Sequence, residues 1–237
     1  KAEVVEIFWR DGANGKRVAD SVEIKLRDGR KRIIRARKGV VVAAGALASS
    51  HLLYKSGILQ AGHNISLNIA CPVVALMPEG KEMNVWDEDQ MATYVDRGDF
   101  LIESHFQPPL SMATLVPGWF EDHYERMRNY GRLVSAGVLF PADRLGHMEN
   151  GKLKFKVGED ELALLRRALA AMTKVHFLNG AEEVYPALLK GQTLYAGMSD
   201  SDIDQFYPDN LKEPEDVVLS SSHPHGGNGI NADPHKG

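Results

Sequence analysis

The residues best suited to chemistry lie near the end of the chain, in the stretch 220–234. Here His223 is followed by Pro224, whose ring stiffens the backbone, and then by Gly226 and Gly227, which can adopt positive φ angles. We therefore predict a rigid loop that holds one imidazole against a large flat ligand. An imidazole held in this way can accept a proton from an alcohol, because histidine changes protonation state near neutral pH.

Two other chemistries of the same stretch have to be considered. His223 and His225 could share a metal ion in a hydrolase, with a third ligand from elsewhere in the chain. The candidates for that ligand are His51, His63, His105 and Asp233, and none lies at local ligand spacing. The Gly-Gly-Asn that follows His225 favours a turn over a strand, so we predict no metal site and keep the hydrolase as a less favoured alternative. The serines 220–222 are interpreted as polar loop residues, because no Gly-x-Ser-x-Gly motif occurs.

Composition limits the class of protein. The chain has 237 residues, of which 43% are hydrophobic and 25% charged, as in an ordinary globular protein. Its net charge is −4 and it has no basic block, so we expect no nucleic-acid partner. No apolar run reaches the roughly 18–20 residues that span a bilayer, so we expect no membrane span. A single cysteine, Cys71, excludes an internal disulfide and leaves the compartment, cytoplasm or periplasm, undecided.

The first 60 residues predict strands and one helix. Residues 4–9 and 21–27 read as strands, Asp28-Gly29 as a hairpin turn, and 30–37 as the returning strand. Residues 39–45 form a continuous apolar run, which is typical of a strand buried on both faces. A helix is predicted over 46–56. A buried strand that turns through glycine into a helix is a nucleotide-binding arrangement, because the first amides of the helix face a phosphate or a ring carbonyl.

Two motifs carry a family resemblance. The stretch 45–58, Gly-Ala-Leu-Ala-Ser-Ser-His-Leu-Leu-Tyr-Lys-Ser-Gly-Ile, resembles the second signature of the glucose–methanol–choline (GMC) oxidoreductases. The C-terminal His223-Pro-His-Gly226, followed by Asp233-Pro234, resembles the His-Pro-x-Gly and Asp-Pro of the same family. The chain departs from the pattern at Ser50, where the family usually has proline, and at 230–231, where Ile-Asn replaces Met-Gly.

The resemblance implies a fold, a cofactor and a reaction. The fold class is α/β (α+β), with part of an FAD-binding Rossmann-like domain in 1–71, a substrate domain with an antiparallel sheet in 72–216, and a return to the FAD-binding domain in 217–237. The reaction is oxidation of an alcohol (a CH–OH donor) by hydride transfer to FAD, with His223 as base and His225 as a second catalytic candidate. The expected FAD contacts are Val4, Gly45, Ala46, Asn228, Gly229, Ile230 and Asn231.

The middle of the chain is expected to build the substrate domain. Residues 72–77, 100–106, 133–140 and 152–156 read as strands, and 119–129, 159–177 and 199–206 as helices. On the second of these strands, Glu103, His105 and Phe106 are our candidates for the wall of the substrate pocket. A cluster of aromatic and methionine residues is interpreted as core rather than as a wall of the substrate pocket: Trp119, Phe120, Tyr124, Met112 and Met127.

Two parts of a complete flavoenzyme are missing from the sequence. No Gly-x-Gly-x-x-Gly follows a strand, and the second active-site residue of the family lies beyond its His-Pro motif. We therefore expect the remaining N-terminal part of the same enzyme, or a companion chain, as a partner, and we regard an electron-acceptor subunit as a further candidate. The alternatives are a non-catalytic partner subunit and a non-redox lyase with the same fold.

Overall fold

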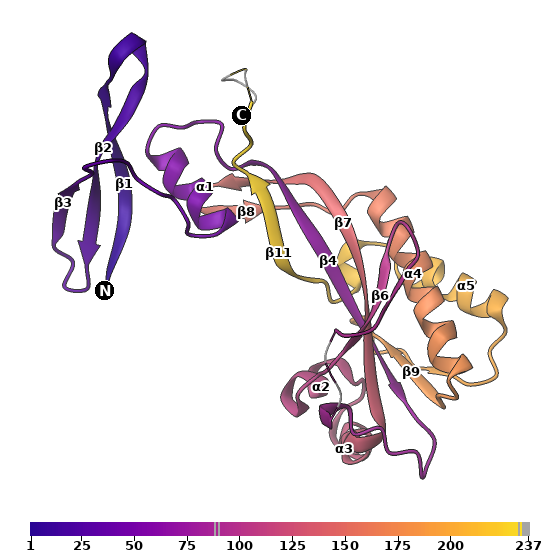
Figure 1. Ribbon diagram of the computed structural model, residues 1–237. Coiled ribbons are helices and arrows are strands. Elements are labelled where there is room, and N and C mark those ends of the chain that lie inside the picture. Colours follow the sequence, from indigo (N-terminus) through magenta and orange to yellow (C-terminus); the bar gives the residue numbers. More distant parts are fainter. Residues whose placement is uncertain (88, 90, 232, 234–237) are drawn as a thin grey trace. The chain divides into compact units, whose positions relative to one another are not determined.

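The computed structural model describes residues 1–87, 89, 91–231 and 233, and it divides into two compact units (Figure 1). The first unit comprises residues 1–67, 143–156 and 224–237, and the second comprises 68–142 and 157–223. Helices and antiparallel sheets occur together in the described residues, which confirms the predicted mixed α/β class. The assignment of one part to FAD and the other to substrate stays a prediction.

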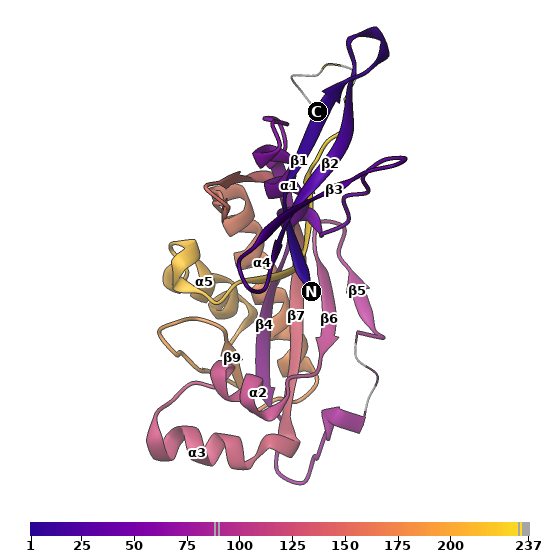
Figure 2. The same cartoon turned by 90° about the vertical axis from the view of Figure 1, so that its left-hand side faces the viewer.

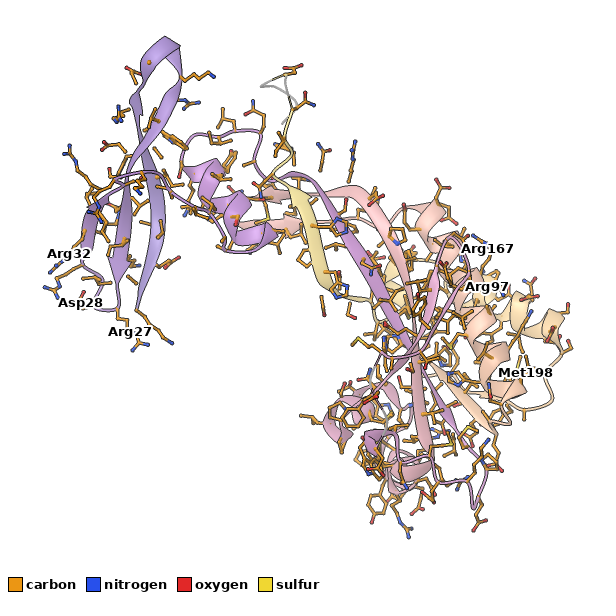
Figure 3. All side chains as sticks on the ribbon, viewed as in Figure 1. Arg27, Asp28, Arg32, Arg97, Arg167 and Met198 are labelled. Carbon is orange, nitrogen blue, oxygen red and sulfur yellow. The ribbon has the colours of Figure 1, made fainter. Side chains whose placement is uncertain are left out.

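The first unit contains a three-stranded antiparallel sheet in the order β1-β2-β3. Its strands are β1 (Ala2–Asp11), β2 (Arg17–Leu26) and β3 (Lys31–Arg35), and a 3-10 turn, η1 (Ala13–Gly15), joins the first two. The predicted hairpin turn is present, and Gly29 has a φ of 83° there. Figure 3 labels Arg27, Asp28 and Arg32 around this turn. The Asp28 carboxylate accepts a hydrogen bond from the Arg30 side chain, which lowers the pKa of Asp28.

The predicted helix follows as α1 (Ala46–Lys55). Gly45 precedes it with a φ of 82°, and Gly57 follows it with a φ of 88°, so both ends use backbone that favours glycine. The Ile7 amide of β1 donates to Ser56 Oγ over 2.9 Å, which ties the sheet to the end of the helix. Because Ser56 and Ile7 are both buried, this bond fixes the helix against β1.

The run 39–45 is not a strand, which corrects the prediction. In the described part of the chain it pairs with no other strand, and the Val41 side chain is 91% exposed. A strand can be buried on both faces only inside a sheet that is covered on both sides. The described sheet of the first unit consists of β1, β2 and β3 and does not include residues 39–45. The apolar run was therefore identified correctly in character, but the described residues supply no sheet to bury it.

A larger sheet has the strand order β10-β9-β4-β7-β6-β5. Two short additions lie off this path, where β8 pairs with β7 and β11 pairs with β4. The strands are β4 (His63–Leu76), β5 (Tyr94–Asp96), β6 (Leu101–His105), β7 (Leu133–Glu149), β8 (Lys152–Lys154), β9 (Glu183–Pro186), β10 (Leu194–Tyr195) and β11 (Ser220–Gly227). The pairs β5/β6, β6/β7 and β4/β9 are antiparallel, as predicted for this part of the chain.

Four helices accompany the large sheet: α2 (Pro109–Leu115), α3 (Phe120–Arg128), α4 (Glu159–Leu178) and α5 (Asp200–Asn210). Short 3-10 turns occur at η2 (Val85–Asp87), η3 (Tyr130–Arg132) and η4 (Pro214–Asp216). Figure 2 shows α4 and α5 next to each other beside β4 and β7. Thr173 of α4 and Tyr207 of α5 share a buried hydrogen bond of 2.6 Å.

The predicted apolar stripe of α4 is buried: Leu162, Leu165, Leu169, Met172 and His176 are each at most 7% exposed. At the start of the helix the Glu161 carboxylate accepts from the Gly158 amide over 3.0 Å. On its exposed side Arg167 donates to Asp99 over 2.7 Å, and Figure 3 shows Arg167 beside Arg97. The bond to Arg167 lowers the pKa of Asp99.

The interior around α2 is apolar. Its buried members are Val74, Leu76, Met112, Val116, Leu133 and Tyr185. The interpretation of the aromatic and methionine cluster as core is correct for Met112, which is fully buried, and Met127 packs against that core. It is wrong for Trp119 and Phe120, which are 84% and 86% exposed, and for the exposed Tyr124. Trp119 and Phe120 flank the start of the short helix α3, which has no buried residue, so its periodicity does not bring them into the interior.

The C-terminal stretch is also different from the prediction. Residues 220–227 form the strand β11 on β4, not a loop. Among the described residues β11 pairs with β4 alone, and proline within sheets is found mainly on such edge strands. The glycines still make a tight corner: an added Cβ would lie 2.5 Å from Asn64 O at Gly226, and 2.6 Å from Ser50 Oγ at Gly227.

Two further features bear on the predictions made from composition. Cys71 is a free, buried thiol, and burial raises its pKa to about 12. Among the helices of the described residues, none combines the length and the apolar character that crossing a bilayer requires.

Candidate active site

His223 projects from β11, and its side chain is exposed. Asn68 of β4 lies next to it, with the amide nitrogen 3.5 Å from His223 Nδ1. The backbone amide of His223 donates to Ser221 Oγ over 3.4 Å. The imidazole is therefore held from a sheet rather than from a loop, and one of its two nitrogens is free to face a ligand.

A cavity of about 220 Å³ opens beside this imidazole. The sequence-predicted residues Glu103, His105 and Phe106 of the β6 region line it together with His223. The remaining walls come from Asn68, Ala70, Pro72, Met91, Gln107, Leu139, Ser220 and Ser222. The fold thus gathers four of the predicted catalytic and substrate-binding residues around one cavity. Three of them lie within 103–106, and the fourth, His223, is more than 100 positions further along the chain.

A second imidazole faces this cavity under tight constraints. His105 Nε2 lies 3.5 Å from a carboxylate oxygen of Glu103, and both side chains are largely buried. The ring lies over Gly137 of β7, where an added Cβ would come within 2.6 Å of His105 Nδ1. In the β6/β7 pairing Gly137 stands opposite Glu103. A glycine at this position therefore makes room for the imidazole and fixes where it sits.

Asn68 decides which proton His223 carries. The amide nitrogen can only donate, so when it faces Nδ1 the neutral ring holds its proton on Nε2. When the amide is turned and its oxygen faces Nδ1, the ring holds its proton there and Nε2 is a free base. The same pair of side chains therefore serves either as a proton acceptor or as a hydrogen-bond donor to an alkoxide.

The predicted FAD contacts lie in the first unit. Gly45, Ala46 and Asn228 line one cavity of about 330 Å³, with Val42, Ala43, Ser49 and Leu53. Val4 lines another cavity of about 520 Å³, together with residues 40–44 and His51. Gly229, Ile230 and Asn231 follow Asn228 as exposed residues and line neither of these two cavities, so their predicted contacts with FAD remain predictions.

The first of these cavities fits an acceptor-rich ring or phosphate. It lies at the start of α1, where the first amides of a helix have no partner within the helix. Gly45 carries no side chain, and nothing described lies within 4 Å of the place where its Cβ would be. Ser49 is turned inward, with its Oγ accepting from the Ala44 amide over 3.1 Å. Small residues and free donors at one opening suit the edge of a flavin.

Some candidate residues are not brought together. His225 lies two residues beyond His223 on β11, exposed and in the first unit, and its catalytic role stays a prediction. The sequence analysis argued against a metal ion shared by His223 and His225 because the following glycines favour a turn. Residues 220–227 form a strand, so this argument no longer holds. Within the described ranges, however, no three His, Cys, Asp or Glu side chains are grouped as a metal ion would require.

Sequence reasoning missed Asn68 and Gly137. Asn68 is one of the polar residues that alternate with apolar ones along 63–69, and only the pairing of β4 with β11 brings it to His223. Gly137 sits in a buried strand, where an isolated glycine is itself a signal for close approach of another group. That signal was available in the sequence, but it does not say which group approaches.

Comparison with known proteins finds a family model that matches the N-terminal part of the chain. Residues 1–74 match the family model described as GMC oxidoreductase. The predicted resemblance to the GMC oxidoreductases is confirmed. GMC oxidoreductases are flavoproteins that use FAD, so the predicted cofactor is confirmed at the level of the family. No curated protein sequence matches the chain at a significant level.

Solved structures match the fold of nearly the whole chain. A formate oxidase variant from Aspergillus oryzae RIB40, determined to study FAD modification, matches with a TM-score of 0.60 and 11% identity over 95% of this chain. A second variant of that enzyme, and a further formate oxidase crystal structure, each match with a TM-score of 0.57 and 10% identity. In each case 50% of the other chain is covered, so this chain spans about half the length of the structures it matches.

Proposed function

We propose that this protein oxidises a small alcohol to the corresponding carbonyl compound, with FAD as the electron acceptor and His223 as the proton acceptor. The observation that carries the proposal is the cavity that His223 shares with Glu103, His105 and Phe106. Family membership supports the use of FAD and an oxidoreductase reaction. The cavity supports the assignment of residues to the substrate side.

The walls of this cavity suit a molecule with one polar end. Phe106, Leu139 and Pro72 offer apolar surface, while His223, Asn68 and Ser222 of β11 and β4 offer hydrogen-bonding groups. The volume of about 220 Å³ admits a small molecule rather than a polymer. We therefore assign the apolar walls to the carbon chain of the alcohol and the His223 side to its hydroxyl group.

His223 handles the proton of the reaction. As the C–O single bond of the alcohol becomes a double bond, the hydroxyl proton passes to the unprotonated ring nitrogen of His223. The hydrogen on carbon leaves as a hydride that carries the electron pair of the C–H bond, so the alcohol loses one proton and one hydride, two electrons in all. FAD, when bound, supplies the acceptor for that hydride.

Asn68 and the pair Glu103–His105 act on either side of this step. We assign to the reaction the orientation of Asn68 in which its amide oxygen faces Nδ1, because the ring proton then sits on Nδ1 and Nε2 of His223 is unprotonated. His105, whose Nε2 faces the Glu103 carboxylate, lies against the substrate and restrains its direction. Positioning of this kind matters because proton and hydride have to leave from a single conformation of the alcohol.

On the cofactor side we assign backbone contacts to Gly45, Ala46 and Asn228, which line one cavity. Amides at the start of α1 would stabilise negative charge that builds up on a reduced ring. Val4, Gly229, Ile230 and Asn231 are proposed as further contacts. Completion of the FAD site by an N-terminal part of the same enzyme or by a companion chain belongs to the same proposal, as does an electron-acceptor subunit.

The test is anaerobic reduction of the FAD-loaded protein by a panel of small alcohols, with formate as a comparison because the matched structures are formate oxidases. The proposal expects loss of the flavin colour with at least one alcohol, and a much slower loss in the Asn68→Leu variant. Formate oxidation without alcohol oxidation contradicts the assigned substrate. A flavin that no donor reduces points to the lyase, and absence of flavin points to the non-catalytic subunit.

A further inference from the structure

A second cavity of the substrate unit has no part in the proposed reaction. It has a volume of about 320 Å³ and lies between the end of α4, the strands β6 and β7, and the segment 77–85. Its walls are mainly apolar and include Met77, Met83, Val85, Ala136 and Val175. We call it the α4 cavity. Its size and its apolar lining are those of a site for a small organic molecule.

Two buried polar atoms in its wall lack a hydrogen-bond partner among the described residues. They are His176 Nε2 and Ser135 Oγ, on side chains of residues that are only 7% and 6% exposed. Both residues line the α4 cavity, one from the helix and one from β7. Buried polar groups are nearly always paired in folded proteins, so two unpaired atoms at one cavity indicate that something else occupies it.

The state of the His176 ring defines what that occupant must offer. A backbone hydrogen bond to Val73 engages the ring. Because Nε2 is the nitrogen without a partner, we assign this bond to Nδ1, with Nδ1 donating its proton to the Val73 carbonyl. Burial lowers the pKa of His176 to about 4, so the ring is neutral at physiological pH. Nε2 is therefore a buried lone pair that needs a hydrogen-bond donor.

Charge around the cavity argues against an anion. A carboxylate would place its lone pairs against the lone pair of Nε2. Lys81 lines the cavity, but its ammonium group donates to the Asn179 carbonyl over 3.1 Å, and Asp89 also lines the opening. Ser135 can both donate and accept, so it complements a hydroxyl group rather than a charge.

We propose that the α4 cavity binds a small, mainly apolar molecule with one hydroxyl group, which donates to His176 Nε2 and pairs with Ser135 Oγ. The site is separate from the proposed reaction and does not depend on it. It is nevertheless adjacent to the His223 cavity, because His105 and Phe106 line both. An occupant of the α4 cavity therefore contacts the same two side chains that form a wall of the proposed substrate site.

Methionine methyl groups provide local reporters for a test. In the full chain labelled with carbon-13 at the methionine methyls, Met77 and Met83 report on the α4 cavity and Met91 on the His223 cavity. Met112, fully buried in the core around α2, is the internal control. The probe is phenol, and toluene is the matched molecule without the hydroxyl group.

The proposal expects phenol to shift the Met77 and Met83 signals saturably, with Met112 unchanged, and toluene to bind about tenfold more weakly, since a buried hydrogen bond is at stake. His176→Leu, which keeps an apolar wall, should abolish the preference for phenol, and Ser135→Ala should reduce it. Any of three results would overturn the proposal. They are shifts confined to Met91, equal binding of phenol and toluene, and ordered water as the only occupant of the α4 cavity at saturating phenol. The comparison in the unmodified protein decides the matter even if a variant fails to fold.

Discussion

Acidification should destabilise the protein through His176. The ring is buried and neutral, and burial lowers its pKa from 6.5 to about 4. In the unfolded chain the same ring takes up a proton near pH 6.5, so below that pH the unfolded state binds more protons than the folded state. The contribution of His176 to stability is therefore fully present above pH 6.5, and it is lost as pH falls from 6.5 towards 4.

The size of the effect follows from the shift. A difference of one pKa unit corresponds to about 1.4 kcal/mol, so the free energy of unfolding should fall by about 3 kcal/mol between about pH 7 and about pH 4 on account of this one residue. Lys81, Asp89 and His105 also line the cavity that His176 faces, and other groups titrate in the same range. The assay therefore has to compare a variant with the unmodified protein.

Urea denaturation at both pH values supplies that comparison. His176→Gln keeps a polar side chain without a titrating ring, so its free energy of unfolding should depend less on pH, by about 3 kcal/mol. His63→Gln, at an exposed histidine, controls for the substitution itself. An identical pH dependence in His176→Gln and the unmodified protein, or an NMR titration midpoint of His176 near 6.5, would refute the reasoning.

Three further predictions concern single substitutions. Gly137→Ala should displace the His105 ring, which would lie 2.6 Å from the new Cβ at Nδ1, and lower kcat/KM for the alcohol about tenfold or more at unchanged FAD content; unchanged kinetics would contradict the role given to Gly137. At Gly227, where φ is 77°, an alanine Cβ would collide with Ser50 Oγ, whereas at Gly29, where φ is 83°, the space around the Cβ is open. Gly227→Ala should therefore destabilise the protein by about 1–3 kcal/mol more than Gly29→Ala. Equal thermal midpoints of the two variants would show that the collision is relieved without cost. Ser199→Ala should remove the cap of α5, where Ser199 Oγ accepts from the Asp202 amide over 3.2 Å, and cost about 1 kcal/mol in thermal denaturation; no loss would mean that the helix start is held by other contacts.

The local elements of this protein were predictable because their signals are local. The hairpin at Asp28-Gly29, the glycine at position 57 after α1, and the apolar stripe of α4 each depend on residues within a few positions of one another. The family motifs at 45–58 and from His223 were equally visible. Together they predicted the mixed α/β class and the resemblance to the GMC oxidoreductases.

Pairings over long distances in the chain were not predictable. The strand β11 looked like a loop because its Pro and Gly residues disfavour a strand, and only its position on β4 explains it. Residues 39–45 looked like a buried strand because their composition is apolar, but burial depends on neighbours that the described residues do not supply. For the same reason Asn68, Gly137 and the unpaired Nε2 of His176 could be recognised only in the folded chain.

The central claim is that His223 accepts the alcohol proton from the cavity it shares with Glu103, His105 and Phe106. The most direct measurement is the rate of flavin reduction by an alcohol in a rapid-mixing experiment on the FAD-loaded protein and its His223→Ala variant. The account predicts that the variant retains FAD while reduction slows by about 10²–10⁴-fold, the usual contribution of a positioned acid–base group. A reduction rate in the variant within about twofold of the unmodified rate would contradict the account, because even the smallest effect expected of such a group is much larger.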